Sequence, residues 1–351
     1  MPKTYNNLYS KICSFENLHL AYLKARKCKR YRKEVLLFSN NLEVNLINLQ
    51  KELSNKTYKS GVYKIFYIHE PKKRKIMALP FRDRVIHHAI CNIIEPIFDR
   101  IFIHDSYACR VGKGVHAGAD RLTQFLREAK REYPKIYCLK CDIKNYFGSI
   151  DHKKLIQIIQ RKIKCHNTMW LIENVINSTD GTKGIPIGNL TSQLFANLYL
   201  NELDYFIKHK YKIKQYIRYM DDWVILSPDK KYLWDILKQT EVFLQKFLLL
   251  QLNNKTSIFP VSQGIDFLGY RIWVTHRLLR KSSKKRMKRK LRVYQVLYNK
   301  NRIDLNRITS SLMSWLGHTS HCNSYNLRKK ILGNLVLKNN IERRLKCVNT
   351  Q

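Results

Sequence analysis

The sequence predicts an α+β fold in which amphipathic helices alternate with short strand-like segments. Three observations predict it. Residues 18–37 and 42–53 have helical apolar periodicity, the segment IYCLKCDI at 136–143 alternates apolar and polar residues, and QYIRYMDDWVIL at 215–226 reads as two strands joined by a tight turn. Hydrophobic residues make up 44% of the 351 residues, which is enough for a sizeable core. The length permits about two or three domains.

The other elements are expected in the following order. Residues 61–79 read as two strands around a basic turn, and residues 82–100 read as a helix that ends near Pro96, because proline disrupts a helix interior. A glycine-rich turn at 112–114 precedes the next helix. Apolar periodicity predicts further helices at 115–130, 152–164, 168–177, about 190–210 and 230–250.

The C-terminal part is expected to form strands followed by basic helices. Gly264 and Gly269 punctuate the strands predicted within residues 256–275. From His276 onward, 20 Lys and Arg residues stand against two acidic residues, and the densest run, RKSSKKRMKRKLR, spans 280–292. Such a run is usually only a solvated face. Here it continues a bias of the whole chain, which favours contact with a nucleic-acid backbone.

The charge of the whole chain points to a polyanionic partner. Lys and Arg number 66 against 26 Asp and Glu, a net charge of +40, and nucleic acid is the first candidate. An anionic membrane surface would require an apolar or amphipathic anchor. The longest apolar stretch, 242–252, is short and interrupted by Gln245 and Lys246, and the N-terminus MPKTYNNLYSK lacks the apolar core of a signal peptide. We therefore expect a cytoplasmic protein that makes no membrane contact.

The nine cysteines have irregular spacing and follow no export signal, so we expect reduced thiols rather than disulfides. Cys138 and Cys141 form a lone CxxC inside a strand-like run. His318, His321 and Cys322 are conceivable zinc ligands, but no fourth ligand is evident, so the sequence does not favour a zinc site.

The adjacent carboxylates Asp221 and Asp222 fall at the predicted hairpin turn. They repel each other, and a hard divalent cation such as Mg²⁺ would relieve the repulsion. An isolated acidic pair is usually only a solvated turn. Asp142, on the polar face of an otherwise buried strand about 80 residues earlier, supplies a third carboxylate. A strand carboxylate and a hairpin pair are what a two-metal nucleotidyl-transfer site requires, with two Mg²⁺ ions or Mn²⁺ as a possible substitute.

Several blocks resemble the motifs of reverse transcriptases. CDIKNYFGSIDH at 141–152 resembles motif A, RYMDDWVIL at 218–226 resembles motif C, and LNNKTSIFP with GIDFLGYRI, at 252–260 and 264–272, resembles the next two motifs. DSYACRVGKGVHAG resembles the block before motif A, and IMALPFRDRVIHHAI, with the basic turn ahead of it, resembles the fingers. The resemblance covers about residues 60–275 in the order of the family.

This resemblance implies a right-hand polymerase fold with fingers, palm and helical thumb, in which the palm is an antiparallel sheet backed by helices. The expected domains are a basic helical N-terminal extension at 1–60, fingers at 61–135, a palm with a helical insertion at 136–275, and a basic helical thumb at 276–351.

One block resembles a particular group within the family. GIPIGNLTSQLFANLYLNELD, at 184–204, occupies the place where most bacterial members carry GxPQGxxxSP, with Ile187 in place of Gln and Gln193 in place of Pro. This form resembles the reverse transcriptases of diversity-generating retroelements. They copy a template-repeat RNA into cDNA with errors at template adenines, and the cDNA replaces a variable repeat of a target gene. The alternative is local repacking in an ordinary member.

A physical argument makes Ile187 plausible as a determinant of fidelity. This segment would lie beside the incoming nucleotide and the templating base. Exchanging an amide for a branched apolar side chain removes hydrogen bonds, and discrimination between bases falls when binding differences shrink to ~1–3 kcal/mol.

The resemblance also implies roles for individual residues. The metal ligands are Asp142, Asp221, Asp222 and the backbone carbonyl of Ile143. Lys255 is implied as a catalytic proton donor to pyrophosphate, although a surface lysine is an alternative. The nucleotide-binding residues are Phe147, Lys72, Arg74, Ile187 and Gln193, with Arg84 and Asn189 as further candidates. Phe147 would be the steric gate against a 2′-hydroxyl or, alternatively, a core aromatic residue.

The primer and template contacts are assigned to Tyr219, Met220 and Gly269. Trp223 is expected in the core, and Asn189 is alternatively a helix N-cap. The implied partners are template RNA, cDNA primer and product, dNTPs, and a small basic accessory variability protein that forms oligomers. That the protein is bacterial or phage-encoded is implied only by the family resemblance of its motifs.

The sequence leaves two alternative functions. One is another bacterial reverse transcriptase of the retron, group II intron or phage-defence type. The end of the chain at Gln351 argues against an intron enzyme, and the absence of NAxxH and VTG signatures argues against a retron. The other is a non-enzymatic RNA-binding protein with a decayed polymerase fold. The presence of all three carboxylates, the aromatic gate and Lys255 argues against decay.

Overall fold

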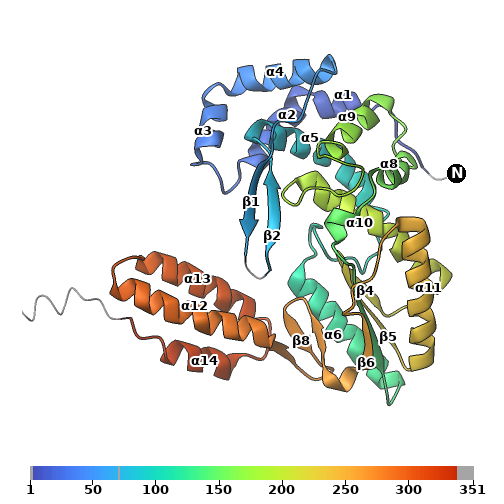
Figure 1. Cartoon of the computed structure of the whole chain (residues 1–351), viewed down its shortest axis with the longest axis vertical. Helices are drawn as coiled ribbons and strands as arrows, with labels where there is room; N and C mark the ends of the chain where they lie inside the picture. The colour runs from blue at the N-terminus through green and yellow to red at the C-terminus, as the bar shows by residue number, and fades with distance from the viewer. Residues whose placement is uncertain (1–2, 70–71, 338–351) are drawn as a thin grey trace, which may run out of the picture. The chain divides into compact units, whose positions relative to one another are not determined.

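The structure is a computed structural model that describes residues 3–69 and 72–337. The chain divides into two compact units (Figure 1). The first unit comprises Met1–Gly114, Leu139–Ile225 and Lys231–Ser257, and the second comprises Val115–Cys138, Leu226–Lys230 and Ile258–Gln351. Each unit is described separately below.

The first unit begins with four helices: α1 (Tyr9–Cys13), α2 (Phe15–Ala25), α3 (Lys33–Asn40) and α4 (Leu42–Ser54). Ser14 caps α2 by accepting a hydrogen bond from the Asn17 N–H. The single helix expected over 18–37 is wrong, because turns at residues 26–32 separate α2 from α3. Cys28 lies in the left-handed region at φ 61°, which no α-helix can accommodate.

A two-stranded hairpin and a long helix follow. β1 (Lys64–Ile68) pairs antiparallel with β2 (Arg74–Ala78), and the hairpin extends away from the helices of this unit (Figure 1). α5 (Phe81–Asp99) matches the helix expected over 82–100 and continues past Pro96, near which that helix was expected to end. Proline removes a helical hydrogen bond, but burial of Ile94, Ile97 and Phe98 on either side of it outweighs that loss.

The central sheet has four strands in the order β4-β5-β3-β6. Its strands are β3 (Tyr137–Asp142), β4 (Tyr216–Tyr219), β5 (Asp222–Ser227) and β6 (Ser257–Pro260). β4 and β5 form an antiparallel hairpin in which Tyr219 faces Asp222 across the turn. Both Cys138 and Cys141 of β3 are buried, so the CxxC lies in the sheet interior.

The remaining helices of the first unit are α7 (Tyr146–Ser149), α8 (His152–Gln160), α9 (His166–Ile176), α10 (Leu190–Tyr205) and α11 (Lys230–Leu248). A π-helical turn at Phe206–Lys210 extends α10, so the two together cover the helix expected over about 190–210. Most residues of α10 are buried all around its axis, including Phe195, Leu198 and Asn201. α10 is therefore a core helix on which other segments of the unit rest.

The second unit contains α6 (Val115–Glu132) and the antiparallel strands β7 (Ile265–Phe267), β8 (Tyr270–Ile272) and β9 (Arg277–Leu279). β9 was not expected, since the sequence predicts helix from His276 onward. Its backbone instead pairs antiparallel with β8, and the Arg277 side chain pairs with Asp120 at 2.6 Å and donates to Thr123, both on α6.

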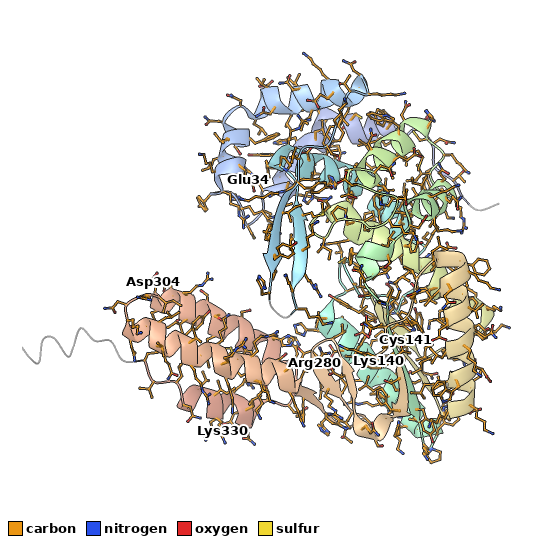
Figure 2. All side chains as sticks on the ribbon, viewed as in Figure 1. Glu34, Lys140, Cys141, Arg280, Asp304 and Lys330 are labelled. Atoms are coloured by element: carbon orange, nitrogen blue, oxygen red, sulfur yellow. The ribbon has the colours of Figure 1, made fainter. Side chains whose placement is uncertain are left out.

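Three helices complete this unit: α12 (Lys281–Asn299), α13 (Leu305–Thr319) and α14 (Tyr325–Gly333). They surround a small core of Met287, Leu291, Tyr294, Ile308 and Ile331. The basic side chains of α12 point outward from that core (Figure 2). The dense basic run is therefore mostly a solvent-facing surface of one helix.

The fold is mixed, with antiparallel strand pairs and helices in both units, which confirms the predicted α+β class. The eight cysteines within the described residues are all free, as expected for reduced thiols. None of the described helices has the length and apolar character needed to cross a bilayer.

Candidate active site

The three acidic residues predicted from the sequence lie at adjacent ends of the central sheet. Asp142 ends β3, Asp221 lies in the β4–β5 turn and Asp222 begins β5. Burial raises the pKa of Asp221 to about 6, and repulsion by Asp142 adds to it. Burial likewise raises the pKa of Asp222 to about 6, against the effect of Lys140. Uncompensated negative charge is therefore concentrated here.

Asp222 has one paired and one unpaired oxygen. The Lys140 Nζ donates to Asp222 Oδ2 at 3.1 Å. Asp222 Oδ1 is buried and, among the described residues, has no hydrogen-bond partner. A buried carboxylate oxygen without a donor is costly, and a divalent cation would satisfy it. Lys140 was not among the predicted site residues, although its place two residues before Asp142 was visible.

A divalent cation fits this donor set only with help from substrate. Among the described residues, no group of three or more His, Cys, Asp or Glu side chains is arranged to hold a metal ion by itself. Mg²⁺ is usually held by one or two carboxylates together with substrate phosphates and water, rather than by a complete protein cage. The carboxylates present match that pattern.

Asn253 is a site residue that the sequence reasoning missed. Its Nδ2 donates to Asp142 Oδ2 at 3.2 Å, and its backbone N–H donates to the Asp142 carbonyl at 2.7 Å. An isolated antiparallel bridge between Ile143 and Leu252 fixes the same stretch of backbone. Asn253 thus orients Asp142. The backbone of Ile143, whose carbonyl is the expected metal ligand, is fixed by its bridge to Leu252. The asparagine pair in LNNKTSIFP was the available signal.

The basic residues of the β1–β2 hairpin act electrostatically on the site. Lys72 and Arg74 are exposed, and both lower the pKa of Asp221 against the larger effect of burial. Arg84 is arranged differently: its guanidinium binds both carboxylate oxygens of Glu34, at 2.8 and 3.1 Å. Arg84 is thus occupied by an ion pair, whereas Lys72 and Arg74 extend towards solvent.

The loop before α10 connects the turn after β3 to β2. The Ile185 N–H donates to the carbonyl of half-buried Phe147 at 2.8 Å, and the Met77 N–H of β2 donates to the Ile187 carbonyl at 2.9 Å. Gly188 has φ 138°, and a Cβ there would lie 2.5 Å from the Met77 carbonyl oxygen, so only glycine fits. Ile187 is half-buried at this junction.

The other predicted nucleotide residues lie nearby along α10. Asn189 occupies the N-cap position but makes no side-chain cap, and its Nδ2 donates instead to the Tyr63 hydroxyl at 2.9 Å. Gln193 is exposed in the first turn of α10. Lys255 is exposed, and its N–H donates to the Asn253 side-chain oxygen at 3.2 Å.

The residues assigned to primer and template divide between the units. Tyr219 is half-buried, and Met220 is buried in the β4–β5 turn. Trp223 is fully buried, which confirms it as a core residue. Gly269 belongs to the second unit, where it occupies the β7–β8 turn at φ 87°.

The histidines considered for zinc form a different cluster. His116 stacks on His321 with ring centroids 3.6 Å apart, and its centroid lies 5.5 Å from that of His318. The Tyr270 hydroxyl lies 3.0 Å from His116 Nδ1. Within the described residues these side chains form no metal-holding group, so the structure does not support the zinc alternative.

Comparison with known proteins defines the class. A family model described as "Reverse transcriptase (RNA-dependent DNA polymerase)" matches residues 59–272, more than half of the chain. The class of enzyme that this match defines is the RNA-directed DNA polymerase. The chain belongs to the reverse transcriptase family, whose members generally use divalent metal ions.

Two relatives illustrate the family. The chain is 26% identical over 286 residues to Protein YkfC of Escherichia coli (strain K12), an alignment that covers 69% of this chain and 73% of YkfC. It is 26% identical over 324 residues to the group II intron-encoded protein LtrA of Lactococcus lactis subsp. cremoris, covering 71% of this chain and 53% of LtrA. The chain thus spans about half the length of LtrA.

Among solved structures, the fold is similar to a telomerase from Candida tropicalis in complex with a TWJ fragment of telomeric RNA. The TM-score is 0.47 at 13% identity, covering 71% of this chain and 52% of that chain. A telomerase from Candida albicans in complex with the same type of RNA fragment gives a TM-score of 0.46 at 12% identity, covering 69% and 49%.

Proposed function

We propose that this protein copies an RNA template into DNA, and that Asp142, Asp221 and Asp222 form its catalytic centre. The observation that carries the proposal is the convergence of three carboxylates, one with an orphaned buried oxygen, at one end of the central sheet. Asp142 and Asp221 would bind both metal ions with help from the Ile143 carbonyl, and Asp222 would be the weaker ligand. Bound there, two Mg²⁺ ions would stabilise the attacking and leaving oxygens.

Residues around the carboxylates complete the proposal. Lys72 and Arg74 would bind the triphosphate, since charge-assisted contacts to phosphate need Lys or Arg. Phe147 would exclude a 2′-hydroxyl. Lys255 would donate the proton to pyrophosphate. Its backbone N–H donates to the Asn253 side chain, which in turn donates to Asp142, so the three residues are linked by hydrogen bonds.

Tyr219, Met220 and Gly269 would contact primer and template. Template RNA, cDNA primer and product, and dNTPs would be the ligands, in keeping with the charge of +40.

We further propose that the enzyme is of the diversity-generating type, which makes errors opposite template adenine. This proposal is supported by the position of Ile187. Its carbonyl accepts a hydrogen bond from the Met77 N–H of β2, and Met77 is three residues from Arg74 along that strand. The preceding loop is bound to Phe147 through Ile185. An apolar side chain at this junction offers no hydrogen bond to a nascent base pair. A small basic accessory protein would be the additional partner.

The test is primer extension on a defined RNA template with Mg²⁺ and four dNTPs, followed by deep sequencing of the cDNA. Wild type should make DNA with errors clustered opposite adenine. Ile187→Gln should lower that error rate by about five- to tenfold, since one recovered hydrogen bond is worth about 1 to 1.5 kcal/mol. Ile187→Leu, which stays apolar, is the matched control and should not change it. Faithful DNA from wild type would contradict the mutagenic proposal while keeping the polymerase.

A second candidate is a faithful reverse transcriptase of the group II intron-like, retron or phage-defence type. The similarity to LtrA over 71% of the chain favours it. The same sequencing experiment separates the two, because this candidate requires an error spectrum with no preference for template adenine.

A further inference from the structure

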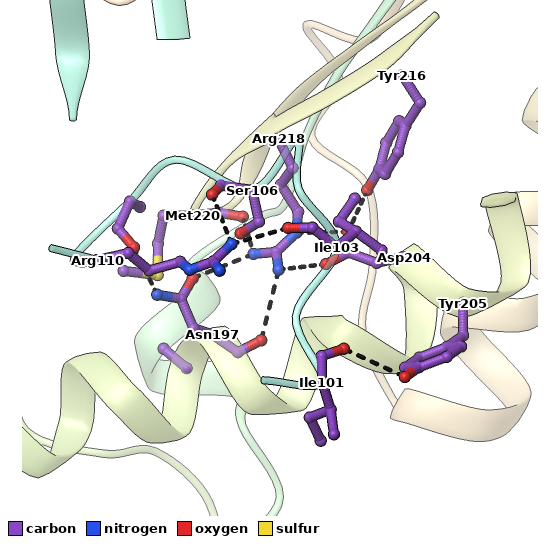
Figure 3. Close-up of polar contacts among 12 residues, drawn as sticks. Ile101, Ile103, Ser106, Arg110, Asn197, Asp204, Tyr205, Tyr216, Arg218 and Met220 are labelled. Carbon is purple, nitrogen blue, oxygen red and sulfur yellow. Dashed lines mark hydrogen bonds and ion pairs between the residues drawn. The ribbon is translucent and has the colours of Figure 1, made fainter. Parts of the chain in front are cut away.

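A buried arginine lies directly behind the turn that carries Asp221. Arg218 of β4 and Asp204 of α10 are both fully buried. The Arg218 Nε donates to Asp204 Oδ1 at 2.7 Å, and one terminal nitrogen donates to Asp204 Oδ2 at 2.5 Å (Figure 3). The carboxylate and guanidinium therefore meet as a two-pronged pair, which fixes the plane of the guanidinium.

The remaining nitrogen of Arg218 reaches the catalytic turn. It donates to the Met220 carbonyl at 3.0 Å and to Asn197 Oδ1 at 3.3 Å (Figure 3). Met220 has φ 56°, a left-handed backbone conformation that is unfavourable for residues other than glycine. Its carbonyl belongs to the peptide that leads into Asp221. Arg218 thus binds the peptide that joins Met220 to Asp221.

Asn197 is itself fixed, so the arrangement has little freedom. Its Nδ2 donates to the Ala108 carbonyl at 2.7 Å, which turns its Oδ1 towards Arg218. The Tyr216 hydroxyl donates to Asp204 at 2.6 Å. Burial opposes the charge of Arg218, but Asp204 raises its pKa well above the usual range, so the guanidinium stays charged.

Stability alone does not explain this arrangement. A buried ion pair must be desolvated, and well-packed apolar side chains often stabilise a protein equally well or better. What apolar side chains cannot do is bind the Met220 carbonyl. Lysine could not replace the arginine either, because an ammonium lacks the planar fork that serves Asp204 and Met220 at once.

We propose that Arg218 is a positioning residue for Asp221: anchored by Asp204, it holds the strained Met220 peptide and so aims the Asp221 carboxylate at the metal ions. The inference rests on the proposed function, since it assumes that Asp221 is a metal ligand. Arg218 is fully buried, and its effect would pass through the backbone of the turn.

The test compares Arg218→Lys with Arg110→Lys. Arg110 is a suitable control because it is also largely buried and donates to Asp99 and to the Ile103 and Ser106 carbonyls, but, among the described residues, it makes no hydrogen bond to the turn. Mn²⁺ binding is measured by electron paramagnetic resonance with primer–template and a non-hydrolysable dNTP present. Thermal unfolding is measured in parallel.

Arg218→Lys should raise the Mn²⁺ midpoint by about tenfold, as loss of a residue that orients a metal ligand does. It should leave the dNTP KM in primer extension nearly unchanged. Arg110→Lys should lower the unfolding temperature without moving the Mn²⁺ midpoint. Equal midpoints in both variants would overturn the proposal.

A triple variant separates folding from positioning. Arg218→Met, Asp204→Leu and Tyr216→Phe together replace the network by apolar side chains and leave no buried charge behind. This variant should stay folded and still lose Mn²⁺ affinity; retained wild-type affinity would overturn the role of Arg218. Failure of the proposed function looks different, because wild type itself would then make no DNA and bind no Mn²⁺ at this site.

Discussion

Lys140 and Asp222 form an ion pair across neighbouring strands, with the lysine Nζ 3.1 Å from Asp222 Oδ2. Lys140 is 21% and Asp222 26% exposed, so water screens this pair only partly. The pair leaves one Asp222 oxygen for another ligand and offsets part of the repulsion from Asp142 and Asp221. Lys140 thus explains how the fold accommodates a third carboxylate before any cation binds.

Removing this counter-charge should therefore destabilise the folded protein. Lys140→Met should lower the free energy of unfolding by about 1 to 3 kcal/mol, because Asp222 loses its partner and its pKa, already raised to about 6, rises further. Urea unfolding in EDTA measures this. Adding Asp222→Asn to Lys140→Met should recover much of the loss, since the stranded charge is then gone. Strictly additive effects of the two substitutions would show that the pair is not coupled.

The catalytic turn should show a conflict between activity and stability. Asp221→Asn should abolish DNA synthesis, by at least about a hundredfold, because an amide is a poor ligand for Mg²⁺. At neutral pH without metal it should also stabilise the fold by about 1 kcal/mol, since burial and Asp142 disfavour the ionised carboxylate. Primer extension and urea unfolding in EDTA measure the two effects. A variant that loses both activity and stability would contradict this account.

The sequence predicted the local positions of the three carboxylates, because each residue stands in a local pattern: Asp142 ends an alternating strand, and Asp221 and Asp222 stand at a hairpin turn. Their role as a catalytic centre stays a prediction. Contacts between distant segments could not be read in this way. Asn253 reaches Asp142 across 111 residues, and nothing local to either residue shows that contact.

The same reason explains two places where local preference does not decide the fold. Pro96 is a helix breaker by local propensity, but burial of its neighbours allows α5 to continue past it. β9 lies within a basic stretch that favours helix, but its backbone pairs antiparallel with β8 and its Arg277 side chain pairs with Asp120 of α6. In both places packing overrides local preference.

Phe147 offers a test of sugar selectivity. Phe147→Ala should lower discrimination against ribonucleotides by about 10- to 100-fold, since removing a steric block of this kind is worth about 1–3 kcal/mol. Competitive incorporation of rNTPs and dNTPs measures it. Tyr146→Phe is the matched control: it keeps the neighbouring ring and removes only the hydroxyl bond to Ala196, so it should leave sugar choice unchanged. If Phe147 is only a core residue, the alanine variant will lose stability without admitting ribonucleotides.

The histidine cluster should make the second unit sensitive to acid. Burial and His321 lower the pKa of His116, and burial and His116 lower that of His318; Arg277 also lowers the pKa of His116, whereas Asp120 raises it. A histidine in the unfolded chain has a pKa of about 6.5, and the folded-state values are lower, so the unfolded chain binds protons more readily near and below that pH. The free energy of unfolding should therefore fall as the pH drops from 7.5 to 5.5 and recover when the pH is raised again.

His116→Phe tests this cluster directly, since it keeps an aromatic ring against His321 and removes a titrating group. The unfolding free energy, measured by urea at pH 5.5 and 7.5, should depend less on pH in the variant than in wild type. The substitution also removes the effect of His116 on the pKa of His318, whereas the acidic centre keeps all of its own groups, so the difference between the two proteins isolates the cluster. His19→Phe in the first unit is the control and should keep the wild-type pH dependence. Identical pH dependence in His116→Phe and wild type would show that protonation of His116 does not oppose folding.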